Sequence, residues 1–65
     1  MLATLTDRER QVAALVCEGL TNRQVGRRML IAEKTVEMHV SRVYRKLNVT
    51  CRVGLLRAVL DERHG

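Results

Sequence analysis

The segment from Thr21 to Leu47 constrains this chain more than any other feature, and its sequence is TNRQVGRRMLIAEKTVEMHVSRVYRKL. The pattern predicts two short helices joined by a tight turn. Seven of its residues are basic and only two are acidic, so this segment alone accounts for the formal net charge of +5. A compact helical pair that concentrates positive charge in this way is suited to bind duplex DNA.

The composition favours one small all-helical domain. The chain has 65 residues, of which 46% are hydrophobic, and this is enough for a modest core without a structural metal. Proline is absent and alternating β-branched stretches are scarce, which argues against strands. We therefore expect a single all-α domain over residues 1–65.

Two other classes of protein are disfavoured by the same composition. Tyr44 is the only aromatic residue, whereas binders of RNA and single strands that use stacking expose several aromatics. The longest unbroken apolar run, Val12–Cys17, is far too short to cross a membrane, and no segment resembles a signal peptide. We expect a cytoplasmic protein without a membrane partner.

The cysteines and histidines do not form a recognisable metal or catalytic pattern. Cys17 and Cys51 lack C-x-x-C spacing, and His39 and His64 add too few ligands for zinc. We expect two reduced thiols in or near the core rather than a disulfide. The motifs do not gather a nucleophile, a base and an orienting group, so we expect neither an enzyme nor a cofactor.

The first expected helix spans residues 7–18. Thr6 and Glu9 have the spacing of a capping box, in which each side chain bonds the backbone N–H of the other residue. Gly19 ends the helix because glycine accepts the left-handed conformation, and Leu20 can then fold back onto the helix. The charges of this helix sum to −1, so we assign it to the scaffold.

The second expected helix spans residues 22–29 and begins with another capping box, formed by Thr21 and Gln24. Gly26 lies in its middle, where glycine costs about 1 kcal/mol relative to alanine. We therefore expect a packing reason for this glycine, namely the close approach of another helix. Residues 30–32 form the turn that follows.

The third expected helix spans residues 33–47. Asn48 can end it in a left-handed conformation, and Thr50 can cap the helix after it. The apolar residues of the third helix recur at spacings of three and four, which predicts one buried face. They are Val36, Val40, Val43 and Leu47.

The fourth expected helix spans residues 51–62. Its apolar residues exceed what one buried face requires. We expect Leu56 and Leu60 to serve the core, which leaves Leu55 and Val59 as candidates for contact with a second copy of the chain.

Several ordered motifs resemble the LuxR-type (GerE-like) helix-turn-helix of bacterial transcription regulators. They are LTDRE at 5–9, EGLTNRQV at 18–25, TVEMHVSRVYRKL at 35–47, and then NV and Arg52. The resemblance covers nearly the whole chain and implies a four-helix domain. It further implies that the third helix enters the major groove, that the second lies across the DNA backbone, and that the fourth often supplies the dimer contact.

Three residues depart from the pattern of that family. Ala32 stands where Ser or Thr usually caps the third helix, and losing a hydroxyl cap costs about 1 kcal/mol. Asn48 stands where glycine is usual. Glu37 stands where the family usually has a basic residue. The resemblance therefore implies a DNA contact at this position, but Glu37 cannot make it in the way a basic side chain does.

Four outward residues of the third helix are candidates for reading bases, namely Glu37, Met38, Ser41 and Arg42. Arg42 can bond guanine at two points, Glu37 can accept from a cytosine amino group, and Met38 can cover a thymine methyl. The alternatives are that Glu37 pairs locally with Lys34 or Ser41, and that Met38 lies along the rim of the core.

A second set of residues is expected to contact the DNA backbone, namely Thr21, Asn22, Arg23, Arg27, Lys34, Thr35, His39, Arg45 and Lys46. The start of the second helix also offers the free amides of Asn22 and Arg23 to a phosphate. The alternative is a solvated basic face. Against it, no acidic residue occurs between Asn22 and Ala32.

These inferences lead to one prediction and one rival. The prediction is a sequence-specific duplex DNA-binding domain, the C-terminal part of a longer bacterial regulator with an upstream sensory domain, which binds DNA as a homodimer. The rival is a helix-turn-helix fold with weak or lost DNA affinity that acts as an interaction module. Glu37 and Ala32 are the residues that support this rival.

Overall fold

Four α-helices and one short 3₁₀ turn make up the described part of the chain. The computed structural model describes the backbone of residues 2–64 and the side chains of residues 3–62. The elements are η1 (Leu2–Thr4), α1 (Asp7–Cys17), α2 (Asn22–Met29), α3 (Glu33–Leu47) and α4 (Arg52–His64). The expected all-α fold is confirmed, and η1 is an addition that the sequence pattern did not predict.

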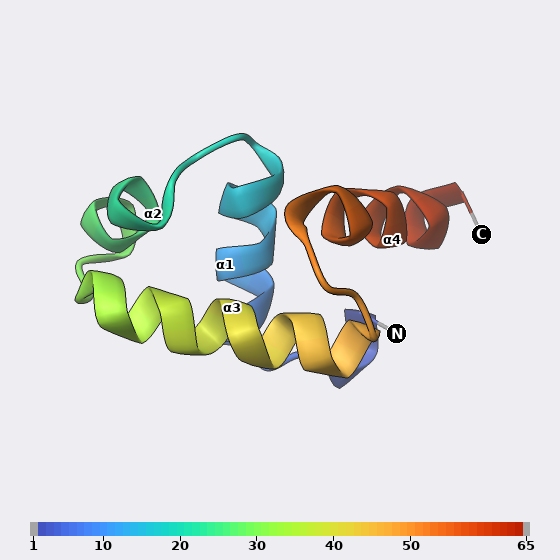
Figure 1. Cartoon of the computed structure of the whole chain (residues 1–65), viewed down its shortest axis with the longest axis horizontal. Helices are drawn as coiled ribbons and strands as arrows, with labels where there is room; N and C mark the ends of the chain where they lie inside the picture. The colour runs from blue at the N-terminus through green and yellow to red at the C-terminus, as the bar shows by residue number, and fades with distance from the viewer. Residues whose placement is uncertain (1, 65) are drawn as a thin grey trace.

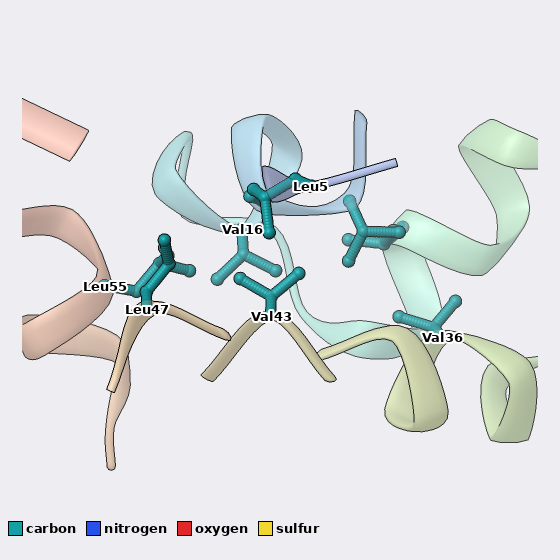
Figure 2. Close-up of a cluster of buried hydrophobic side chains, with 9 residues drawn as sticks. Leu5, Val16, Val36, Val43, Leu47 and Leu55 are labelled. Carbon is teal, nitrogen blue, oxygen red and sulfur yellow. The ribbon is translucent and has the colours of Figure 1, made fainter. Parts of the chain in front are cut away.

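The long helix α3 forms one side of the molecule, and the other three helices pack on it or on one another (Figure 1). Helix α1 stands against α3 between α2 and α4, so that α2 and α4 lie at opposite ends of the molecule. Every α-helix contributes to one hydrophobic core, which Figure 2 shows in part. Its buried members are Leu5, Val12, Ala13, Val16, Val25, Val36, Val43, Leu47 and Leu55.

Both predicted capping boxes are present. The Glu9 amide donates to Thr6 Oγ1 over 3.1 Å, and the Thr6 amide donates to the Glu9 carboxylate over 2.9 Å. The corresponding bonds between Thr21 and Gln24 measure 3.2 and 2.8 Å. These bonds satisfy helix-start amides that would otherwise lack partners, and they fix where α1 and α2 begin.

The end of α1 follows the predicted glycine stop. Gly19 has a φ of +98°, and its amide donates to the Val16 carbonyl. The Leu20 amide donates to the Leu15 carbonyl over 3.3 Å, which confirms that the chain folds back onto the helix. The helix itself ends at Cys17, one residue earlier than expected.

Gly26 lies in α2 where the turn between α2 and α3 passes closest to the helix. A Cβ at this position would stand 2.8 Å from the backbone oxygen of Ile31, which is too close for any other residue without a shift. The Gly26 carbonyl also accepts from the Leu30 and Ile31 amides. The expected packing reason is therefore confirmed, and the chain that approaches is mainly the turn.

The fourth helix departs from the prediction at its start. It begins at Arg52 rather than at residue 51. The Leu55 amide donates to the Cys51 carbonyl over 3.0 Å, so Cys51 precedes the helix and Thr50 lies one residue too early to cap it. The helix also continues to His64, beyond the expected end at residue 62.

The predicted orientation of α4 was wrong for its leucines. Leu55 is 1% exposed and belongs to the core, whereas Leu56 and Leu60 are 41% and 43% exposed. Val59 packs against the core as a partly buried residue. The helix docks on α1 with Leu55 on its inward side, so Leu55 is not available to a partner.

Candidate DNA interface

The four base-reading candidates share one exposed face of α3. The helix buries Val36, Val43 and Leu47, and a residue on the opposite side of an α-helix must face away from that core. Glu37, Ser41 and Arg42 are exposed, and so is Met38, at 43%. Met38 therefore lies on the outer surface rather than in the core.

The polar side chains of this face are unpaired. Among the described residues, Glu37, Ser41 and Arg42 have no side-chain hydrogen bond or ion pair. The local pairs of Glu37 with Lys34 or Ser41 are thus not present. A face of free donors and acceptors remains open to an external partner.

Exposed cations lie on both helices of the helix-turn-helix. Lys34 and Arg45 are exposed on α3, and Arg23 and Arg27 are exposed on α2. Because α2 and α3 pack closely against each other, these charges belong to one region of the surface. Such a region attracts the phosphates of nucleic acid.

The start of α2 presents free backbone donors beside these cations. Thr21 is the N-cap, and its hydroxyl accepts from the Gln24 amide, while the Val25 amide donates to the Thr21 carbonyl. The amides of Asn22 and Arg23 have no partner within the helix, as is normal for its first turn. They can donate to a phosphate.

The start of α3 is open in a different way. Ala32 is the N-cap and offers no side-chain hydrogen bond, as the sequence predicted. Thr35 and His39 follow on the helix and are only partly exposed. The Nδ1 atom of His39 is buried and has no hydrogen-bond partner among the described residues.

Lys46 occupies a position that the sequence did not predict. Its Nζ lies 2.7 Å from the carboxylate of Glu9, whose side chain is only 3% exposed, and 3.2 Å from the Thr4 carbonyl. The Lys46 hydrogen bond is the main cause that holds the pKa of Glu9 below its usual value, while desolvation opposes it. Lys46 is thus engaged in joining α1 to α3. Its partner lies 37 positions away in sequence, so no local pattern signals the pair.

Arg52 is a second structural cation, and it holds the loop that precedes α2. Its guanidinium donates to the Leu20 carbonyl over 2.6 Å, which links the start of α4 to the residues after α1. Burial raises the pKa of the nearby Cys17 thiol, and the positive charge of Arg52 acts in the opposite direction. Cys17 therefore lies against the core as predicted, whereas Cys51 is exposed, so the prediction was wrong for that thiol.

The outer face of α4 is apolar. Val53 is 71% exposed, and Leu56 and Leu60 are each about two-fifths exposed. Their spacing of three and four places them on one stripe of the helix. A cavity of about 310 Å³ beside this stripe is lined by Ala14, Cys17, Glu18, Leu56, Val59 and Leu60.

The described residues contain no group of three or more His, Cys, Asp or Glu side chains that could hold a metal ion. Over the same part of the chain, none of the helices has the length and apolar character needed to cross a membrane.

Known proteins resemble this chain over most of its length. Residues 3–59 match the luxR family of bacterial regulatory proteins, also called GerE. The DNA-binding transcriptional activator DevR/DosR of Mycobacterium tuberculosis is 51% identical over 51 residues, which cover 78% of this chain and 24% of that protein. The nitrate/nitrite response regulator NarL of Escherichia coli is 39% identical over 59 residues, covering 91% of this chain and 27% of NarL.

A third relative, the transcriptional regulatory protein DegU of Brevibacillus brevis, is 45% identical over 51 residues, covering 78% of this chain and 22% of DegU. This chain thus spans about a quarter of the length of each of the three relatives. The family match extends over all of α1, α2 and α3 and over the first half of α4. The chain belongs to the luxR family of bacterial regulatory proteins.

Proposed function

We propose that this chain is the sequence-specific, double-stranded DNA-binding domain of a bacterial transcription regulator. The observation that carries the proposal is the unpaired outward face of α3, which lies among exposed cations of α2 and α3. Family membership supports the same function, since DevR/DosR is described as a DNA-binding transcriptional activator. The proposal assigns the domain no catalytic role.

In this proposal α3 lies in the major groove, which has the width to admit an α-helix. Glu37, Met38, Ser41 and Arg42 then face base edges. The remaining cations and the free amides at the start of α2 contact phosphates, which position the domain without reading sequence. Lys46 contributes through its contact with Glu9 and through its charge rather than as a free phosphate ligand.

The interaction-module alternative is less well supported. Its sequence arguments were the acidic Glu37 and the uncapped Ala32. The basic side chains of α2 and α3 are exposed to an anionic partner, and the relatives DevR/DosR and DegU are transcription regulators. The interaction-module function would be supported only if a binding experiment showed weak DNA affinity without sequence preference.

We further propose that two copies bind adjacent half-sites through α4. The contact uses Val53, Leu56 and Leu60 in place of the buried Leu55. One short helix buries little area, so we expect the isolated domain to associate weakly and to pair mainly on DNA. An upstream regulatory domain in the full-length protein and a cytoplasmic location complete the proposal, by analogy with the longer response-regulator relatives.

A salt-dependent binding titration tests the main proposal. The chain is titrated onto a duplex enriched from a random pool and onto an unselected duplex, at several salt concentrations. A DNA reader binds the enriched duplex more tightly, and its affinity falls steeply with salt as counterions are released. Equal, weak and salt-insensitive binding of both duplexes would favour the interaction module.

A further inference from the structure

Two acidic side chains interrupt the basic surface of α3, and only one has a structural explanation. Glu33 and Glu37 are both exposed, one turn apart, and neither has an ion pair or side-chain hydrogen bond among the described residues. Glu33 is the first residue of a helix that lacks a side-chain cap, where the helix dipole stabilises a negative charge. Glu37 lies beyond that first turn, so the dipole does not account for it.

The surroundings of Glu37 suit a direct contact with DNA. Ser41 lies four positions further along the chain, so both residues lie on the same side of α3, and Met38 is the exposed neighbour of Glu37. Lys34 is exposed one turn earlier, and Arg45 is exposed further along the same surface. These cations offset the repulsion between the carboxylate and the phosphates that flank a groove.

The chemistry of a carboxylate restricts which base it can contact. An ionised carboxylate only accepts hydrogen bonds, and the major-groove edges of guanine and thymine offer it only acceptors. Cytosine offers the N4 amino donor. Adenine offers an amino donor beside the N7 acceptor, which suits an amide better than a carboxylate.

We propose that Glu37 determines specificity by accepting a hydrogen bond from a cytosine amino group at one position of each half-site. The inference rests on the proposed function, because it requires α3 to lie in the major groove. It assigns to Glu37 a contact that the exposed cations cannot make, since arginine and lysine side chains only donate hydrogen bonds.

Selection from a randomised duplex library tests this role, with four forms of the chain compared after circular dichroism has shown that each is folded. The wild type should enrich cytosine at one position by about 5- to 150-fold over other bases. Glu37→Ala should lose this preference there alone and should bind unselected duplex more tightly. Glu37→Gln should shift the preference towards adenine, which pairs with an amide. Glu33→Gln removes the same charge one turn away and should keep the cytosine preference.

Two results would overturn the inference. If Glu37→Ala binds every duplex more tightly with an unchanged base preference, Glu37 only repels phosphates. If neither Glu37 variant changes affinity or preference, the side chain is simply solvated. If the wild type still selects a sequence in these experiments, the proposed function stands although the role of Glu37 fails. A wild type that selects no sequence would contradict the proposed function and the role of Glu37 together.

Discussion

Leu30 and Asn48 end two successive helices in the same backbone conformation, with φ values of 60° and 56°. Asparagine tolerates this left-handed region, whereas leucine incurs a steric cost of about 1–2 kcal/mol. Leu30 is also 90% exposed, so little burial compensates for the strain. The turn between α2 and α3 therefore contains a residue that a simple substitution should improve.

We predict that Leu30→Asn raises the free energy of unfolding by about 1 kcal/mol, because asparagine accepts the left-handed conformation. For a domain of this size the melting temperature should rise by roughly 4–8 °C. Leu30→Ala keeps the strain and serves as the control, which should melt near the wild type. A gain equal in both variants would mean that removing the exposed leucine, and not relief of strain, is responsible.

The Glu9–Lys46 pair predicts a specific dependence of stability on pH. The pKa of Glu9 is lowered from its ordinary value of 4.5, chiefly by Lys46, so folding favours the ionised carboxylate. This contribution is fully present above pH 4.5 and is lost as the pH falls through the lower folded-state value. Thermal melting between pH 7 and pH 3 should show a smaller acid-dependent loss in Glu9→Gln than in the wild type.

Glu37→Gln is the matched control for this measurement, because Glu37 is exposed, lies beyond the first turn of α3 and has no ion partner among the described side chains. The melting temperature of this variant should fall between pH 7 and pH 3 as much as that of the wild type. An equal fall in melting temperature in the wild type and Glu9→Gln would show that the Glu9–Lys46 pair does not contribute to acid sensitivity.

At the scale of elements, the geometry of the helix-turn-helix depends on close passage of the turn over α2. We predict that Gly26→Ala destabilises the domain by about 1–2 kcal/mol. Overpacking a tight site costs about 1–3 kcal/mol, and this exceeds the gain of about 1 kcal/mol in helix propensity. Chemical denaturation measures the change, and Arg27→Ala on the exposed face should remain within about 0.5 kcal/mol of the wild type. A stabilised Gly26→Ala would show that the turn can move away without cost.

Substitutions on the two faces of α4 should have different effects, one on stability and the other on cooperative DNA binding. Leu55→Ala should destabilise the monomer by about 2–5 kcal/mol, because it empties a buried site in the core. Leu56→Glu should leave the fold and the affinity for one half-site unchanged but remove cooperative binding to two. Sedimentation with one-site and two-site duplexes distinguishes these effects, and persistent cooperativity in Leu56→Glu would refute the α4 dimer.

The parts that sequence predicted well are governed by local physics. The capping boxes at Thr6 and Thr21, the stop at Gly19 and the buried stripe of α3 depend on neighbours within one or two turns, and all are confirmed. The errors involve packing between distant segments. The inward side of α4 was misassigned because that helix has apolar residues on both faces, and only its docking on α1 chooses between them.

The same limit applies to the candidate site. Periodicity placed Glu37, Met38, Ser41 and Arg42 on the exposed face of α3, as the structure has them. It could not show that Lys46 turns to Glu9, because that ion pair joins two helices far apart in sequence.

At the scale of the whole molecule, the excess positive charge lies in one segment. The segment 21–47 carries seven basic and two acidic residues, whereas the rest of the chain is balanced. We predict that Arg23→Ala, Arg27→Ala and Arg45→Ala each weaken binding to selected and random duplex alike, and lower the salt slope by about one. Arg57→Ala, on α4, is the control. An unchanged slope in all three variants would contradict the proposed docking.

The most direct test of the central claim is to map the surface that duplex DNA contacts. Amide chemical shifts of the ¹⁵N-labelled chain are recorded as its selected duplex is added. We predict that the largest changes in chemical shift fall on Met38, Ser41 and Arg42 of α3 and on Asn22 and Arg23 at the start of α2. Changes confined to α1 and α4, with the outward face of α3 unaffected, would contradict it.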